Sequence, residues 1–195
     1  MAYPTTWSSG VRTAYVTISA KAGTDYEFMT ILSDVSESGG DRPVEQIVTL
    51  AGGNLKNYRP QEPVTIDLTV YAPAFSSTTS DPAGGMLGFM YAATDTSDPI
   101  SFTNDRTRKD VRLVIMKTQD PNATKATSAT STTYAAKRET YIGGDITTHT
   151  TSVNDGLEET SCTFTFFPYD KDGTANFTFE QTAGASGLPA IAAYS

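Results

Sequence analysis

The sequence predicts a mainly β domain, and three observations lead to that prediction. The 195 residues include 32 threonines, and threonine is a β-branched, half-polar residue that suits a pleated surface with one wet face. Apolar and polar residues alternate without a break over Val64–Tyr71, which is the period of a half-buried strand. Gly-Gly and Asp-Gly pairs separate the short apolar runs. We therefore expect a β-sandwich or open barrel with one short α-helix, a long inter-strand loop and extended N- and C-terminal arms.

The strands are expected where β-branched or alternating segments occur. Residues 1–10 are polar and contain proline and glycine, so they are predicted to form the N-terminal arm. We expect the last two strands to form a hairpin around the Asp-Gly turn at residues 169–173, and we expect a strand pair in Tyr134–Thr151 that turns at Gly143 and Gly144. The predicted strands are Val11–Ser19, Tyr26–Asp34, Val44–Leu50, Val64–Tyr71, Asp110–Lys117, Glu158–Pro168 and Thr174–Thr182.

One helix and three irregular segments complete the prediction. Pro82 suits the first turn of a helix that Asp81 caps, and the apolar residues 86, 89, 90 and 93 fall on one helical face. A long loop with Gly39-Gly40 is expected over Val35–Pro43, and polar residues continue to Pro63 after the strand at 44–50. Residues 122–133 are low in complexity and predict another loop. The domain is thus expected to span 11–182, with a C-terminal arm over 183–195.

Composition and charge exclude several classes of protein. The formal net charge is −8 with only 14 Lys and Arg, which argues against a nucleic-acid binder because phosphate neutralisation needs clustered basic side chains. The longest apolar stretch, Gly84–Ala93, is far shorter than a membrane span. The first residues lack the basic and apolar regions of a secretory signal. We expect no membrane partner, and the single cysteine excludes an internal disulfide.

The inventory of catalytic residues is nearly empty. His149 is the single histidine, and the sequence contains neither a GxSxG nor an HExxH motif. Cys162 alternates with Phe164 and Phe166, which predicts a small buried side chain and not a nucleophile. The segment Asp170–Gly173 fails the spacing of a calcium loop and is explained by a hairpin turn. We expect a structural or interaction protein with no enzymatic activity, no cofactor and no metal.

The order of elements resembles that of the major tail tube proteins of tailed, siphovirus-like viruses of bacteria or archaea. The first resemblance is a strand at Tyr26–Asp34, a Gly- and Pro-containing segment up to residue 63, and the alternating strand Val64–Tyr71. The second is the short helix at Pro82–Ala93 that follows. The third is the C-terminal run from Tyr141 to Phe166, where a Gly-bearing strand leads to an Asn-Asp-Gly turn and a Thr-rich last strand.

This resemblance implies a virion protein that forms stacked, six-membered rings around a channel for the viral genome. The implied partners are further copies of the chain and other tail proteins such as the tape measure, terminator and distal tail proteins. Genomic DNA would pass without specific binding, and the protein would be made in the host cytoplasm. Two alternatives stay open: a capsid-decoration or fibre protein, and a sugar-binding β-sandwich module that uses the 20 aromatic residues.

Two sets of residues are candidates for the roles that a tube subunit implies. Polar positions opposite the core residues of a strand are the ones that would meet DNA, so the lumen-lining candidates are Thr65, Asp67, Thr69, Asp145 and Thr147. The tip of the long loop would make ring-to-ring contacts. The stacking candidates are Ser38, Gly39, Gly40, Asp41 and Arg42.

Overall fold

The computed structural model describes residues 13–23, 25–29, 35–71, 85–90, 108–120, 123, 125–154, 157–170, 172–182 and 186–195. The prediction of a mainly β fold with one short helix is confirmed within these ranges. The elements are β1 (Thr13–Ala20), β2 (Asp25–Met29), β3 (Val35–Gly39), β4 (Val44–Val48), β5 (Asn54–Tyr58), β6 (Val64–Tyr71), α1 (Gly85–Met90), β7 (Arg108–Thr118), β8 (Ala136–Asn154), β9 (Leu157–Phe166) and β10 (Phe177–Thr182). The predicted N-terminal arm at 1–10, the cap Asp81 and residues 122 and 124 of the loop predicted over 122–133 lie outside the described residues.

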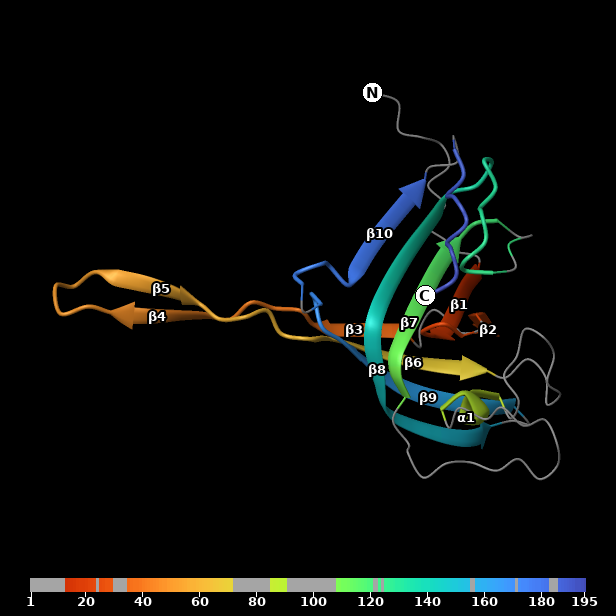
Figure 1. The fold of residues 1–195 in the computed structure, drawn as a ribbon, viewed down its shortest axis with the longest axis horizontal. Helices are drawn as coiled ribbons and strands as arrows, with labels where there is room; N and C mark the ends of the chain where they lie inside the picture. Colours follow the sequence, from red (N-terminus) through yellow and green to blue (C-terminus); the bar gives the residue numbers. More distant parts are fainter. Residues whose placement is uncertain are drawn as a thin grey trace.

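Six antiparallel strands close into a small barrel (Figure 1). The pairing runs β1–β2–β6–β9–β8–β7 and returns to β1. The seam between β2 and β6 is the weakest, because it consists of the single pair Met29 and Tyr71. The expected sandwich or open barrel is thus a barrel whose pairing closes. β3 and β10 lie at the two ends of the sheet order, so each has one edge without a partner strand among the described residues.

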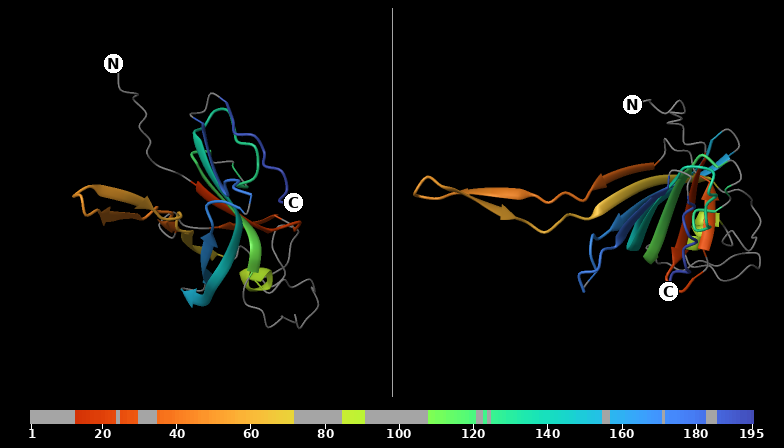
Figure 2. Two further views of the ribbon diagram at one scale, coloured as in Figure 1. Left: turned by 60° about the vertical axis from the view of Figure 1, so that its left-hand side comes forward. Right: turned by 90° about the horizontal axis from the view of Figure 1, so that it is seen from above.

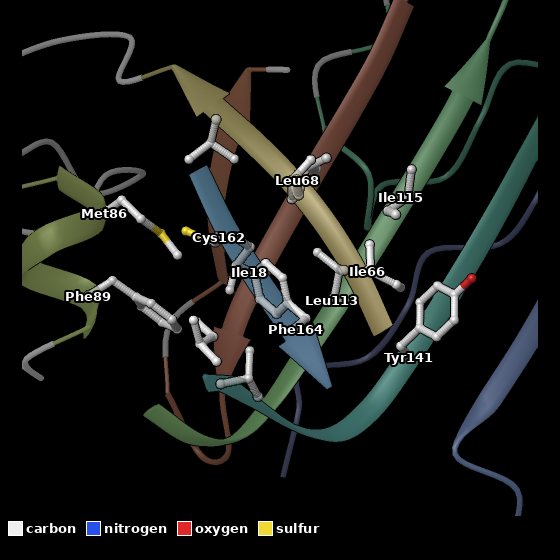
Figure 3. Close-up of a cluster of buried hydrophobic side chains, with 14 of the residues drawn as sticks. Ile18, Ile66, Leu68, Met86, Phe89, Leu113, Ile115, Tyr141, Cys162 and Phe164 are labelled. Carbon is white, nitrogen blue, oxygen red and sulfur yellow. The ribbon is translucent and has the colours of Figure 1, made fainter. Parts of the chain in front are cut away.

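The barrel interior is filled by alternate residues of its strands (Figure 3). Ile66, Leu68 and Val70 of β6 are buried, as the alternation in the sequence predicts. Met86 and Phe89 project from α1 into the same cluster, which confirms the predicted apolar face of the helix. The remaining members come from β1, β7, β8 and β9, with Ile18, Leu113, Tyr141 and Phe164 among the largest.

The prediction of a turn at Gly143 and Gly144 is wrong, because β8 is one continuous strand of 19 residues. A Cβ atom on Gly144 would lie 2.2 Å from the Phe166 ring, so this glycine lets the strand pass close to β9. Gly143 has a φ of +68°, and the register between β7 and β8 shifts beside it. The glycines therefore allow an irregular, bent strand and not a reversal of the chain (Figure 2).

We expect Gly144→Ala to destabilise the barrel by about 1–3 kcal/mol, because the new methyl group overlaps the buried Phe166 ring. Equilibrium denaturation with urea measures the loss. Gly53→Ala in the β4–β5 turn is the matched control, since its nearest contact is a flexible threonine hydroxyl at 3.3 Å. Equal denaturation midpoints for the two variants would contradict the packing argument.

The expected hairpin of the last two strands forms only next to the turn, where Tyr169 bridges Ala175 and the Asn176 amide donates to the carbonyl of Pro168. The Asp-Gly turn forms, with the Gly173 amide donating to the carbonyl of Asp170. The strands on either side nevertheless pair with β8 and not with each other: β9 follows the second half of β8, and β10 follows its first half. Asn176 is buried at the junction and donates from its side chain to the carbonyl of Phe167. The turn therefore connects β9 and β10, which both pair with β8.

The long loop expected over Val35–Pro43 is largely structured. Its first residues form β3, which pairs with β6. The predicted strand at Val44–Leu50 is confirmed as β4, and the polar stretch after it contains β5, with which β4 pairs. These two strands form a hairpin, residues 44–58, that projects away from the barrel (Figures 1 and 2). We call it the projecting hairpin.

The C-terminal segment 186–195 packs against its own domain. Leu188 is buried, and Ile191 packs with Val114 and Met116 on the outer face of β7. The guanidinium groups of Arg112 and Arg138 are buried beneath the segment and donate to the carbonyls of Ala192 and Pro189. The described part of the predicted C-terminal arm is thus bound within the single chain, contrary to an arm that extends away from the domain.

Candidate functional site

The predicted lumen-lining residues of β6 lie on the outside of the barrel. Asp67 is exposed, and Thr65 and Thr69 are half-buried, whereas the residues between them point into the core. Thr65, Asp67 and Thr69 therefore share one outward face, as the alternation predicts.

The same face continues across β9 onto β8. Thr65 of β6 pairs with Thr165 of β9, and Thr165 pairs in turn with Asp145 of β8. The predicted residues Thr65 and Asp145 therefore lie in one row, two strands apart. Thr147 is exposed and lies at a register shift between Ile146 and Thr148. The structure thus brings all five lumen candidates onto one surface. β8 is not a direct neighbour of β6, because β9 lies between them.

We call this surface the polar face: the outward residues of β3, β6, β9 and residues 145–154 of β8. Its hydroxyl groups are linked across the strands. The Thr163 hydroxyl donates to Asp67 Oδ1 at 2.7 Å, and the hydroxyls of Thr69 and Ser161 lie 3.0 Å apart. A shallow hollow of about 400 Å³ occupies its centre, lined by Ser36, Asp67, Leu68, Thr69, Thr148, Thr150, Ser161, Cys162 and Thr163.

The charges on the polar face have one sign. The four strand segments that build it contain no lysine or arginine. Its outward carboxylates are Asp67, Asp145 and Glu159, which are in register with outward hydroxyl residues. Such a surface is well hydrated and repels polyanions, because no cation offsets the negative potential.

The strand at the centre of the polar face is the predicted strand Glu158–Pro168, observed as β9, but its position between β6 and β8 was not predicted. Ser161, Thr163 and Thr165 of β9 separate the predicted residues of β6 from those of β8. Their signal is present in the sequence, since they alternate with Cys162, Phe164 and Phe166, which are all buried. These three outward residues of β9 could therefore have been identified from the sequence as a solvent-facing row.

The chemistry expected of Cys162 agrees with the structure. The thiol is buried, and burial raises its pKa to about 12. A thiol in this state does not act as a nucleophile at neutral pH. His149 lies opposite Cys162 in the register of β8 and β9 and is half-buried.

We expect iodoacetamide to alkylate Cys162 of the folded protein roughly a thousandfold more slowly than a free thiol at pH 8, because burial raises the pKa of this thiol to about 12 and leaves a very small thiolate fraction. In urea above the unfolding midpoint, alkylation should reach the free-thiol rate. Mass spectrometry of timed samples measures both rates. Equal rates in the folded and unfolded protein would contradict the buried placement.

The predicted stacking residues lie at the root of the projecting hairpin and not at its tip. Ser38 and Gly39 end β3, and Gly40 donates its amide to the carbonyl of Pro63. Asp41 accepts from the amide of Glu62, and Arg42 follows it before β4 begins. The tip is the turn over residues 49–53, closed by three hydrogen bonds between Thr49 and Gly53.

The root contains two glycines in the left-handed region, Gly39 with φ +80° and Gly40 with φ +75°. A Cβ atom on Gly39 would lie 2.3 Å from the carbonyl oxygen of Pro63. Side chains are therefore excluded where the chain leaves the barrel. These two residues set the direction of the hairpin, whereas the contacts with other surfaces belong to the strands beyond them.

The projecting hairpin carries an unusual amount of exposed apolar surface. Six large apolar side chains lie on it, namely Val44, Ile47, Val48, Leu50, Leu55 and Tyr58, and all are exposed. A two-stranded hairpin is marginally stable alone in water, and exposed apolar patches of this kind mark interaction sites. The sequence analysis did not identify this surface because it did not pair Val44–Val48 with the polar segment Asn54–Tyr58.

The described residues show no further site. No group of three or more His, Cys, Asp or Glu side chains in them is arranged to hold a metal ion. Within the same ranges, no helix is long and apolar enough to cross a membrane.

The fold defines a class: a small antiparallel barrel with a helix at one end and a long projecting hairpin. No protein-family model matches the chain, and no curated protein is similar to it in sequence. Among solved structures, it is similar to a chain of the PVC sheath–tube complex of an extracellular contractile injection system, with 11% identity, a TM-score of 0.49, and coverage of 91% of this chain and 95% of that one.

Two further structures are similar in the same way. A chain of the sheath/tube terminator of the PVC system has a TM-score of 0.48 at 11% identity, over 91% of this chain and 99% of that one. A chain of the anti-feeding prophage cap, a tube-terminating cap, has a TM-score of 0.42 at 11% identity, over 93% and 94%.

Proposed function

We propose that the chain is a structural subunit of a viral tail tube, without enzymatic activity, whose copies form stacked rings around a channel for DNA. The observation that carries this proposal is that the chain presents two contrasting surfaces, one on its barrel and one on its projecting hairpin. The polar face has carboxylates and hydroxyls with no cation, and the projecting hairpin has exposed apolar side chains. The first suits a conduit for a polyanion, and the second suits assembly.

The polar face supports the role of channel wall. A basic wall would bind phosphates and retain DNA, because each neutralised phosphate releases counterions. In six-membered rings, each ring would carry a formal charge of about −48 from six chains of −8. DNA then passes without specific binding, and the hydroxyl rows keep a layer of water between the wall and the duplex.

The free strand edges support ring formation. β3 and β10 each have an edge that no other described strand covers, and such edges pair readily with strands of another chain. A heterologous contact of one edge with the other, repeated by rotation, closes a ring and leaves no edge exposed. The hairpin then supplies contacts between rings. Other tail proteins, such as tape measure, terminator and distal tail proteins, are the proposed partners in the virion.

The polar face also bears on the sugar-binding alternative. Carbohydrate modules place aromatic rings against the sugar, but none of the nine residues that line the hollow is aromatic. A capsid-decoration or fibre protein shares the β composition, and the form of the assembly distinguishes it from a tube.

Asp67→Lys tests the channel wall. We expect tubes of this variant to retain linear duplex DNA in 20 mM salt and to release it above 300 mM, because one lysine per copy repeats a positive charge around each ring. Tubes of the original chain should retain none. Co-sedimentation of tubes with fluorescent DNA measures the bound fraction. The control is Asp172→Lys, which makes the same charge change at an exposed residue outside the polar face. Equal DNA binding by the two variants would show that Asp67 does not line the channel.

A further inference from the structure

The projecting hairpin has apolar side chains on both of its faces. The register pairs Val44 with Tyr58 and Ile47 with Leu55. Successive residues of a strand point to opposite sides, so Val44, Val48 and Tyr58 share one face, and Ile47 and Leu55 share the other. A hairpin that lay flat on a single surface would need apolar residues on one face only.

Neither face is covered by another part of the chain that the structure describes. β4 and β5 form a separate two-stranded sheet that no other described strand joins. Val48 is 73% exposed on one face, and Ile47 is 48% exposed on the other. Leu50 at the tip is fully exposed. Burying these side chains is worth about 1.5–3 kcal/mol each, so two covering surfaces would stabilise the hairpin more than one.

The charge of the hairpin suits burial against copies of the same chain. The chain carries −8, but residues 41–62 contain three acidic and three basic residues and are formally neutral. Arg59 and Glu45 form an ion pair across the hairpin at 3.1 Å. A neutral insert approaches an acidic copy without the repulsion that two acidic surfaces would have.

We propose that the hairpin of each copy inserts between two other copies of the same chain. One copy covers the face of Val44, Val48 and Tyr58, and the other covers the face of Ile47 and Leu55. This inference rests on the proposed tube, since it names the partners of the hairpin within it. Each hairpin thereby joins three chains, so the contact that stacks the rings also holds two neighbouring copies together.

Four single variants test whether both faces are buried. Val48→Glu and Ile47→Glu place a carboxylate on opposite faces of the hairpin. Gln46→Glu and Asn57→Asp add the same charge at exposed polar residues of the matching faces. We expect each apolar variant to raise the critical concentration for tube assembly more than tenfold, and each control to raise it less than threefold. Pelleting assays over a dilution series measure it, and urea denaturation verifies that each variant folds.

The outcomes separate this inference from the proposed function. If the original chain forms tubes and only one of Val48→Glu and Ile47→Glu impairs them, the hairpin lies on one surface and the inference is wrong, although the tube stands. If the original chain forms no ring or tube, the proposed function fails as well.

Cross-linking gives a second measurement that does not depend on impaired assembly. The double variant Ile47→Cys/Val48→Cys carries a benzophenone-maleimide on each face, while buried Cys162 stays unlabelled. When a trace of labelled chain is mixed into unlabelled tubes, irradiation should give a covalent product of three chains. Products of no more than two chains would overturn the inference.

Discussion

Replacing residues 44–58 with a short Gly-Ser linker will leave the barrel folded and abolish the stacking of rings. None of the core residues lies in this segment, and the hydrogen bonds from the Gly40 amide to the Pro63 carbonyl and from the Glu62 amide to the Asp41 carbonyl close the root without it. The free energy of unfolding should therefore change by less than about 1 kcal/mol. The six exposed apolar side chains that join the rings are removed together. Sedimentation velocity should show single rings where the original chain gives long tubes.

The control for this replacement is Gly52→Ala at the tip, where an added Cβ has no neighbour within 4 Å. Its left-handed φ of +76° adds local strain, but the apolar side chains remain, so tubes should form. Tubes of normal length from the linker variant would show that the hairpin is only a surface connection.

Removing residues 186–195 will destabilise the folded chain by about 3 kcal/mol or more. Arg138 is almost completely buried, and its guanidinium donates to Glu180 Oε2 and to the carbonyls of Ser128 and Pro189. Arg112 donates to the carbonyl of Ala192 and forms an ion pair with Asp25. Truncation removes one acceptor from each arginine and uncovers the apolar outer face of β7. Thermal and urea denaturation measure the loss.

A chain that lacks Ser195 alone is the matched control, because this residue is exposed and the acceptors of the two arginines are the carbonyls of Ala192 and Pro189. It should match the full chain. If the longer truncation also matched the full chain, the C-terminal segment would be an arm that only neighbouring subunits order, as the sequence alone led us to expect.

The elements with regular local patterns were predictable from the sequence. The alternation in Val64–Tyr71 identified β6 and the side of it that faces water, and helical spacing identified α1. Cys162 was correctly placed in the core by its alternation with two phenylalanines. In each case, a side chain's environment follows from its position in one strand or helix.

The errors occurred where a partner distant in the sequence decides the structure. Gly143 and Gly144 look like a turn, but the space that Gly144 leaves is filled by the Phe166 ring. β5 has a polar sequence and is a strand because β4 pairs with it. Arg112 and Arg138 gave no local signal of burial, since the backbone carbonyls that accept from them belong to the C-terminal segment.

The candidate site, too, was predictable where local alternation decides the structure and not where distant partners decide it. The five residues proposed for the channel wall share one face because strand alternation fixes it, but the intervening β9 was not foreseen. The stacking residues were placed about ten positions from the tip, because the root glycines resemble a loop end when the hairpin beyond them is not recognised. Alternation predicts which side of a strand is wet, and it does not predict which strands are neighbours.

Electron microscopy of the purified, concentrated chain tests the central claim most directly. The proposed tube subunit should give end-on views of closed rings with an open centre and side views of hollow tubes with a regular axial repeat. Discrete monomers throughout the concentration series, or solid fibres without a channel, would contradict it.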